Sequence, residues 1–158
     1  MSSGSPETVP DIEFTLGDGS TRRFADYAGK WLVVYFYPKD NTPGCTREGQ
    51  DFNERLARFR RNGAEVLGVS KDSQKTHQNF AAKHGFGFGL VADTDQSVCE
   101  AFGVIQEKTL YGRKYMGIVR STFLVDPDGA IREVWQPVKV PGHAEAVLDA
   151  LKAHKKSR

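Results

Sequence analysis

Residues 31–37 form an uninterrupted apolar run of seven residues, bounded by Lys30 on one side and by Pro38 and Lys39 on the other. A membrane-spanning helix needs about 20 apolar residues, so this run is too short to cross a bilayer. A continuous apolar run of this length is typical of a strand at the centre of a sheet that is covered on both faces. The chain is therefore expected to fold around one fully buried strand.

Strand and helix signals alternate along the rest of the chain. A Gly-Asp-Gly turn at residues 17–19 joins two short strand patterns near the start of the chain, and an Asp-Pro-Asp-Gly turn at residues 126–129 joins two later ones. Helices are expected where apolar residues recur at helical spacing, and Gly63 and Gly85 mark the ends of two of them. The expected strands span residues 11–16, 21–24, 31–37, 65–69, 88–91, 118–125 and 130–135, and the expected helices span residues 46–62, 73–84, 95–102 and 143–154.

This order of elements predicts an α/β fold of the thioredoxin-like type. A central mixed β-sheet would be flanked by helices, and an N-terminal β-hairpin would extend it. Because the sequence contains no repeat and no break in composition, residues 9–154 are expected to form a single domain. Residues 1–8 are rich in Ser, Gly and Pro and are expected to be disordered, and residues 155–158 are expected to form a basic tail.

Charge and cysteine content restrict the partners and the compartment. The net charge of +2 is too small to indicate a nucleic acid or an anionic membrane as a partner. The first ten residues lack an apolar signal segment, and two cysteines 54 positions apart do not resemble the framework of a secreted domain. A cytoplasmic protein with reduced thiols is expected. The four histidines lack zinc-site spacing, so no metal site is expected, and they are interpreted as surface or helix-end residues.

Cys45 is the candidate nucleophile. It follows the buried strand by eight residues, across a turn that contains Pro38, Pro43 and Gly44. Chemistry in open α/β sheets collects beyond the carboxyl ends of the strands, and the free N–H groups of a first helical turn favour the thiolate, which is the nucleophilic form. Its polar neighbours favour this interpretation over a small buried apolar residue. Thr42 places a hydroxyl at the same end of the helix.

The segment around this cysteine resembles a known family. Pro38, Thr42 and Cys45 fit the P-x-x-x-T-x-x-C motif of peroxiredoxins, and the surrounding residues resemble the peroxiredoxin Q or bacterioferritin comigratory protein subfamily. Further matches lie at residues 98–104 and 117–126, so the resemblance covers nearly the whole chain from residue 11 to residue 152. It implies a thiol-dependent peroxidase that reduces hydrogen peroxide and organic hydroperoxides without a cofactor.

The same resemblance implies roles for individual residues. Cys45 would be the peroxidatic cysteine, whose thiolate attacks the peroxide and becomes a sulfenic acid. Thr42 would help to hold the peroxide oxygens, and Arg120 would favour the thiolate and stabilise charge on the leaving oxygen. A surface charge on a strand is the alternative interpretation of Arg120. Pro38 would shield the site from water. Three residues are expected to bind substrate or shape the site: Pro38, Gly44 and Glu48.

A second, resolving cysteine is missing from its usual places. Members of the subfamily carry it five residues after the first cysteine or on the following helix, where this chain has Gln50 and Ala81. A one-cysteine mechanism is therefore expected, with thioredoxin, glutaredoxin or a small thiol as the external reductant. Cys99 is interpreted as a buried core thiol, and it is a candidate resolving cysteine only after local unfolding. The resemblance implies a monomer or a weak homodimer.

Other interpretations of the cysteine remain open. A thiol–disulfide oxidoreductase would need a second cysteine at the position of Thr42, which makes this class unfavourable. A peroxide-sensing, thioredoxin-fold interaction module without turnover would need the same reactive Cys45 as an enzyme. A two-cysteine mechanism that joins Cys45 to Cys99 is the remaining alternative. Insulin reduction and the amount of peroxide consumed per protein would separate these classes.

Overall fold

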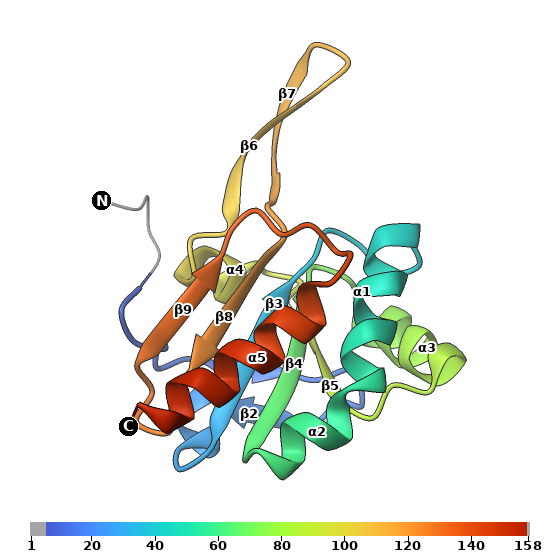
Figure 1. Ribbon diagram of the computed structural model, residues 1–158. Coiled ribbons are helices and arrows are strands. Elements are labelled where there is room, and N and C mark those ends of the chain that lie inside the picture. Colours follow the sequence, from blue (N-terminus) through green and yellow to red (C-terminus); the bar gives the residue numbers. More distant parts are fainter. Residues whose placement is uncertain (1–5, 158) are drawn as a thin grey trace.

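The computed structural model describes residues 6–157, which fold around a mixed five-stranded sheet (Figure 1). The strand order is β5-β4-β3-β8-β9. β3 is parallel to β4, which is parallel to β5, whereas β8 is antiparallel to both β3 and β9. The strands of this sheet are β3 (Trp31–Phe36), β4 (Ala64–Ser70), β5 (Gly89–Ala92), β8 (Ser121–Val125) and β9 (Ile131–Trp135).

The apolar run at residues 31–37 forms the central strand, as expected. Every residue of β3 is buried, because β4 and β8 flank its edges and helices and loops cover both of its faces. Val33, Tyr35 and Tyr37 point into one core, and the alternate residues Leu32 and Val34 point into the other. Successive side chains of a strand face opposite sides, so the continuous apolar pattern supplies two cores at once.

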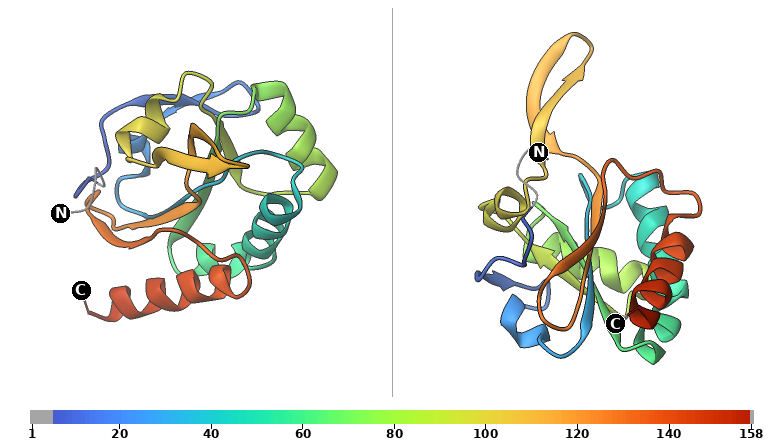
Figure 2. Two further views of the ribbon diagram at one scale, coloured as in Figure 1. Left: turned by 90° about the horizontal axis from the view of Figure 1, so that it is seen from above. Right: turned by 60° about the vertical axis from the view of Figure 1, so that its left-hand side comes forward.

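Helices cover the two faces unequally (Figure 2). One face carries the larger helices, and the other carries the short helices together with the N-terminal segment. The helices on the first face are α1 (Pro43–Glu54), α2 (Leu56–Arg61), α3 (Gln74–His84) and α5 (His143–Lys156). The second face is covered by the 3-10 helix η1 (Phe24–Tyr27), α4 (Ser97–Ala101) and the N-terminal hairpin of β1 (Glu13–Thr15) and β2 (Thr21–Arg23). The predicted thioredoxin-like α/β fold and its N-terminal hairpin are confirmed.

The single helix predicted at residues 46–62 is wrong. It begins earlier, at Pro43, and a break at Arg55 divides it into α1 and α2. The backbone N–H of Arg55 donates to the Phe52 carbonyl. Its guanidinium donates to the Asp51 carbonyl at 2.9 Å and to the Glu145 carboxylate of α5 at 3.0 Å. The side chain therefore replaces the backbone bond that would have continued the helix.

The second difference is a two-stranded arm that the sequence pattern did not predict. β6 (Ile105–Leu110) and β7 (Arg113–Ile118) form an antiparallel hairpin that projects from the body of the molecule (Figure 1). Because β7 ends at Ile118, the strand predicted from residue 118 begins at Ser121 instead. Both faces of the outer part of the arm are exposed, so its sequence carries no burial period.

The chain ends also differ from expectation. Residues 1–5 and 158 lie outside the described part, but residues 6–8, for which disorder was predicted, are ordered. The carbonyl of Glu7 accepts from the Ile131 N–H at 2.9 Å, and Thr8 pairs with Ala130 at the turn between β8 and β9. At the other end α5 extends to Lys156, so half of the predicted basic tail is helical.

Candidate active site

Cys45 lies inside the first turn of α1 rather than before it. Thr42 is the N-cap, with an extended backbone, and Pro43 occupies the first helical position, where its missing N–H costs no hydrogen bond. The N–H groups at the start of a helix have no partner within the helix and carry the positive end of its dipole. Cys45 therefore lies at the positive end of the α1 dipole, and the residue is only 2% exposed.

Arg120 contacts this sulfur although it lies 75 residues later in the chain. It immediately precedes β8, and Ser121 of β8 pairs with Phe36, the last residue of β3. This register brings the Arg120 guanidinium to the loop that leads to α1, where Nη2 lies 3.3 Å from Sγ of Cys45. Although burial opposes its charge, the Glu48 carboxylate and the Cys45 sulfur raise the pKa of Arg120 above its ordinary value. The group is a fixed cation beside the thiol.

Glu48 is the second hydrogen-bond partner of the same guanidinium. It stands three residues after Cys45 on the same side of α1, and its Oε1 accepts from Nη1 of Arg120 at 2.7 Å. Its other oxygen is buried and has no hydrogen-bond partner among residues 6–157. Burial raises the pKa of Glu48 to about 7, and Arg120 only partly opposes this shift. The carboxyl therefore changes its charge near neutral pH.

The remaining predicted site residues precede Cys45, in the loop and at the start of α1. The Thr42 hydroxyl donates to the Lys39 carbonyl at 2.9 Å, which leaves its oxygen lone pairs able to accept a hydrogen bond. Pro38 is half-buried at the start of this loop. A Cβ on Gly44 would lie 3.2 Å from Nη2 of Arg120, so the glycine leaves room for the guanidinium beside the sulfur.

Cys99 is placed away from this group. It belongs to the core on the opposite face of the sheet from Cys45, and it is fully buried. Burial and the neighbouring Asp93 carboxylate raise the pKa of the Cys99 thiol far above its ordinary value. Asp93 also accepts the backbone N–H groups of Val98 and Cys99 at 3.0 Å and 2.8 Å, which fixes the start of α4. Both thiols are free.

Comparison with known proteins places the chain in a family. Residues 6–134 match the AhpC/TSA family. The chain belongs to this family. Peroxiredoxin Bcp of Xanthomonas campestris is 54% identical over 151 residues, which are 96% of this chain and 94% of that protein. Peroxiredoxin Bcp of Bacillus subtilis is 44% identical over 146 residues, which are 92% of this chain and 93% of that protein.

Solved structures agree with this assignment. A structure of Xanthomonas campestris peroxiredoxin Q superimposes with a TM-score of 0.90 at 54% identity and covers 95% of each chain. The predicted resemblance to the peroxiredoxin Q, or bacterioferritin comigratory protein, subfamily is confirmed, and with it the thiol-dependent peroxidase activity of this peroxiredoxin. Within residues 6–157 no helix has the length and apolar character needed to span a membrane.

Sequence reasoning did not single out His143 of this peroxiredoxin, a buried residue close enough to Arg120 for its charge to be felt. It was interpreted as a surface or helix-end residue. It does begin α5, but it is buried there rather than at the surface. Its Nε2 lies 2.8 Å from the Thr122 hydroxyl, and burial followed by the positive charge of Arg120 lowers its pKa to about 4. Its sequence signal is that it begins the helical apolar stripe continued by Ala144 and Val147.

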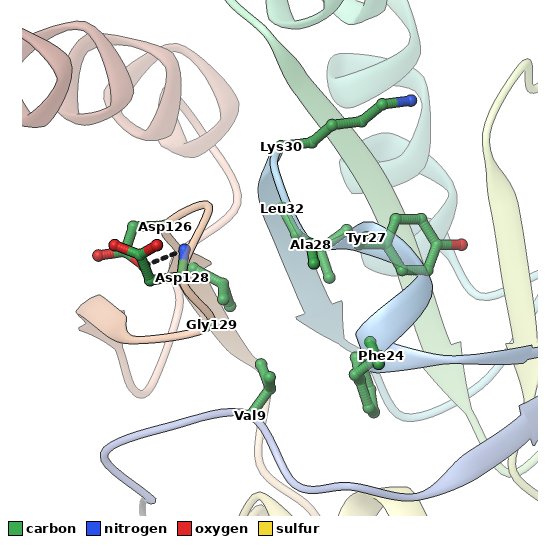
Figure 3. A pocket seen from close by; sticks show the side chains of 11 residues that line it. Val9, Phe24, Tyr27, Ala28, Lys30, Leu32, Asp126, Asp128 and Gly129 are labelled. Carbon is green, nitrogen blue, oxygen red and sulfur yellow. Dashed lines mark hydrogen bonds between the residues drawn. The ribbon is translucent and has the colours of Figure 1, made fainter.

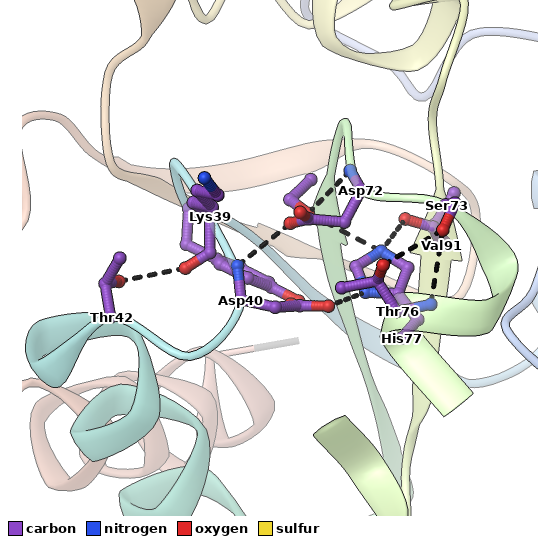
Figure 4. Close-up of polar contacts among 10 residues, drawn as sticks. Lys39, Asp40, Thr42, Asp72, Ser73, Thr76, His77 and Val91 are labelled. Atoms are coloured by element: carbon purple, nitrogen blue, oxygen red, sulfur yellow. Dashed lines mark hydrogen bonds and ion pairs between the residues drawn. The ribbon is translucent and has the colours of Figure 1, made fainter. Parts of the chain in front are cut away.

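His77 was interpreted as a surface or helix-end residue, and this interpretation is wrong. It is fully buried on α3, with Nδ1 2.6 Å from Oδ2 of Asp40 in the loop before Cys45 (Figure 4). Among the described residues Asp40, Asp72 and His77 form a group whose ligand atoms lie within 4.8 Å of one another. Each of these three side chains already makes hydrogen bonds within the protein. The expected absence of a metal site stays a prediction.

One apolar pocket lies away from the cysteine. Its volume is about 230 Å³, and it opens between η1, the start of β3 and the β8–β9 turn (Figure 3). Phe24, Tyr27 and Leu32 line it together with Val9. Because Cys45 follows the other end of β3, this pocket does not belong to the site around the cysteine.

Proposed function

We propose that Cys45 is the peroxidatic cysteine of this peroxidase. The observation that carries the proposal is the 3.3 Å contact between its sulfur and the Arg120 guanidinium, within the first turn of α1. A fixed cation and the helix dipole both favour the thiolate. The thiolate attacks one oxygen of a hydroperoxide, so that an S–O bond forms and the O–O bond breaks. Cys45 becomes a sulfenic acid, and the second oxygen takes up the proton released by the thiol and leaves as water or an alcohol.

Arg120 and its neighbours stabilise the charge that moves during this step. Nη2 of Arg120 lies beside the sulfur, where it can donate a hydrogen bond to the leaving oxygen as negative charge develops there. Nη1 is held by the Glu48 carboxylate. Thr42 accepts a hydrogen bond from the protonated peroxide oxygen. Pro38 and Gly44 keep the loop close to the guanidinium and limit the access of water. Glu48 is a positioning residue, because it acts through Arg120.

Reduction of the sulfenic acid is proposed to follow a one-cysteine route. Two Xanthomonas peroxiredoxin Q structures carry cysteine-to-serine changes at positions 36 residues apart, and 36 residues after Cys45 this chain has Ala81. Cys99 is buried on the other face of the sheet, and a disulfide needs Cα atoms within about 7 Å. One external thiol would displace water and form a mixed disulfide with Cys45. A second thiol would then release the reduced Cys45 and a small disulfide.

The substrates and the setting follow from the same chemistry. A solved structure of the Xanthomonas bacterioferritin comigratory protein concerns alkyl peroxide reduction activity, which supports organic hydroperoxides as substrates here besides hydrogen peroxide. The reductant would be thioredoxin, glutaredoxin or a small thiol. Two uncross-linked thiols support a cytoplasmic, antioxidant role. A monomer or a weak homodimer is proposed as the working form.

Turnover with an added thiol tests both parts of the proposal. Cys45→Ser should abolish peroxide consumption, whereas Cys99→Ser should retain it, because Cys99 takes no part in either half-reaction. Many equivalents of peroxide should be consumed per protein when thioredoxin or glutathione is supplied. Activity that survives in Cys45→Ser would refute the proposed nucleophile, and activity lost in a folded Cys99→Ser would refute the one-cysteine route.

A further inference from the structure

A buried polar cluster links the loop before Cys45 to α3. Asp40, five residues before Cys45, has a fully buried carboxylate that contacts His77 at 2.6 Å and accepts from the Tyr37 hydroxyl at 2.6 Å (Figure 4). Its backbone N–H donates to Oδ2 of Asp72 at 2.9 Å, and Ser70 donates to the same oxygen at 2.6 Å. The loop is thus held through both its backbone and its side chain.

The hydrogen bonds of His77 show how the protons are arranged. Nε2 lies 2.8 Å from the Val91 carbonyl oxygen, which can only accept, so Nε2 carries a hydrogen. The 2.6 Å contact between Nδ1 and the Asp40 carboxyl needs one more proton, which the two groups share. Neither side chain is exposed to water, so separating them would leave Oδ2 of Asp40 and Nδ1 of His77 buried without a hydrogen bond.

No comparable tie holds the rest of this loop. Within residues 6–157, the side-chain hydrogen bonds that connect residues 38–44 to another element are made at Asp40, whose carboxylate contacts His77 and whose N–H donates to Asp72. The Thr42 hydroxyl bonds only to Lys39 of the same loop. The next residue, Asn41, has a positive φ of 65°, so the chain reverses immediately after the tie. The Asp40–His77 contact is therefore one of the two ties that set the position of the Cys45 turn, and it is the one made by the Asp40 side chain.

Cys45 has two requirements that conflict. Attack on peroxide needs the closed arrangement in which its sulfur faces Arg120. Reaction with an external thiol needs access to a sulfur whose residue is only 2% exposed, so the loop or the first turn of α1 must move. Any contact that holds the loop shut favours the first half-reaction and opposes the second.

We infer that Asp40 and His77 are positioning residues that form a latch for the Cys45 loop, closed for peroxide attack and released for reduction by an external thiol. The inference rests on the proposed role of Cys45. It predicts that breaking the latch slows oxidation of Cys45 by peroxide and speeds reduction of the oxidised protein. A residue that only stabilised the fold would not act oppositely on these two steps.

Alkylation of the two cysteines tests the latch. His77→Gln keeps an amide that reaches the Val91 carbonyl but has no group at the position of Nδ1, and Asp40→Ala removes the carboxylate. His77→Asn is the conservative variant, because its amide nitrogen can replace Nδ1 as the donor to Asp40. His154→Gln changes another histidine–carboxylate contact, at 2.9 Å to Glu133, away from the site. Each reduced protein is treated with iodoacetamide, and peptide masses give the rate at Cys45 and at Cys99 separately.

Cys99 acts as an internal reference for global unfolding, because it is fully buried in the other core. His77→Gln and Asp40→Ala should raise the Cys45 rate about tenfold or more relative to the Cys99 rate, as expected for local opening. His77→Asn and His154→Gln should stay near the wild-type ratio. Equal acceleration at both cysteines, or none at Cys45, would overturn the latch. Because alkylation does not depend on peroxide chemistry, failure of the proposed nucleophile would not alter this result.

Discussion

Arg120 is the residue on which the electrostatics of the site depend most. Its two terminal nitrogens contact the Cys45 sulfur and the Glu48 carboxylate at the same time. Only a planar guanidinium supplies two such donors in a fixed fork. The short Glu48 contact therefore fixes the direction in which Arg120 presents its second nitrogen to the sulfur.

Replacing this guanidinium should slow the peroxide step more than it affects the fold. Arg120→Gln should lower the second-order rate constant for oxidation of Cys45 by about 100- to 1,000-fold, as for loss of a preorganised donor to a developing negative charge. Stopped-flow oxidation under single-turnover conditions measures it. Arg132→Gln is the matched control, because Arg132 pairs with Asp126 at 3.3 Å outside the site. A loss below about tenfold in folded Arg120→Gln would argue against the role of Arg120.

Glu48 should make the stability of the protein depend on pH. Its pKa rises from 4.5 to about 7 in the folded state, so folding favours the neutral carboxyl. The resulting stability is complete below pH 4.5 and is lost as the pH rises through 7. Glu48→Gln cannot ionise at this position and so does not lose this stability. The free energy of unfolding of Glu48→Gln minus that of wild type should therefore rise by about 3 kcal/mol from acidic to alkaline pH.

Urea unfolding of both proteins across this pH range measures the difference. Glu54→Gln is the control, because Glu54 is an exposed residue of the same helix. An advantage of Glu48→Gln that stays constant with pH would contradict the raised pKa of the Glu48 carboxyl.

At the scale of elements, the start of α5 combines packing with a buried titratable group. His143 is buried there against Phe52 and Trp135 and lies 2.8 Å from the Thr122 hydroxyl of β8. It is therefore part of the contact between α5 and the sheet. Because burial favours its uncharged form, the docking of α5 should weaken in acid.

The pKa of His143 falls from 6.5 to about 4 on folding. Its contribution to stability is therefore complete above pH 6.5 and is lost as the pH falls through 4, by about 3 kcal/mol. His143→Gln keeps an amide near Thr122 and should flatten the acid limb of a plot of Tm against pH. His84→Gln, at the part-exposed end of α3, should leave that limb unchanged. Equal acid limbs in wild type and His143→Gln would refute this account.

The elements that sequence pattern predicted are those with a local signal. The buried strand at residues 31–37, the N-terminal hairpin and the closing helix each carry a complete apolar period or a turn sequence. The break at Arg55 carries none, because it depends on a side-chain contact with Glu145, 90 residues later. The β6–β7 arm turns at Tyr111 and Gly112, both with positive φ, and Tyr-Gly is a weaker hairpin signal than Asn-Gly.

The candidate site divides in the same way. Cys45, Thr42 and Pro38 are close in sequence, so one motif indicated them together. Arg120 joins them only through the pairing of β8 with β3, and a family resemblance supplied what local pattern could not. The contacts of Asp40 with His77 and of Thr122 with His143 cross between elements and had no comparable signal.

At the scale of the whole molecule, the central sheet separates the two thiols. Cys45 packs with the core beneath α1 and α5, whereas Cys99 packs with the core beneath α4 and the N-terminal segment. A disulfide between them would require one core to open. The proposed dependence on an external thiol is thus a consequence of the architecture as well as of Gln50 and Ala81.

The most direct test is the intact mass of the protein, measured without reductant after one equivalent of peroxide. Wild type and Cys99→Ser should both gain one oxygen atom, as expected for a sulfenic acid on Cys45, and Cys45→Ser should remain unchanged. Addition of thioredoxin or glutathione should return the oxidised protein to its starting mass. A loss of two hydrogens in wild type that disappears in Cys99→Ser would contradict the account, because it would show a disulfide between Cys45 and Cys99.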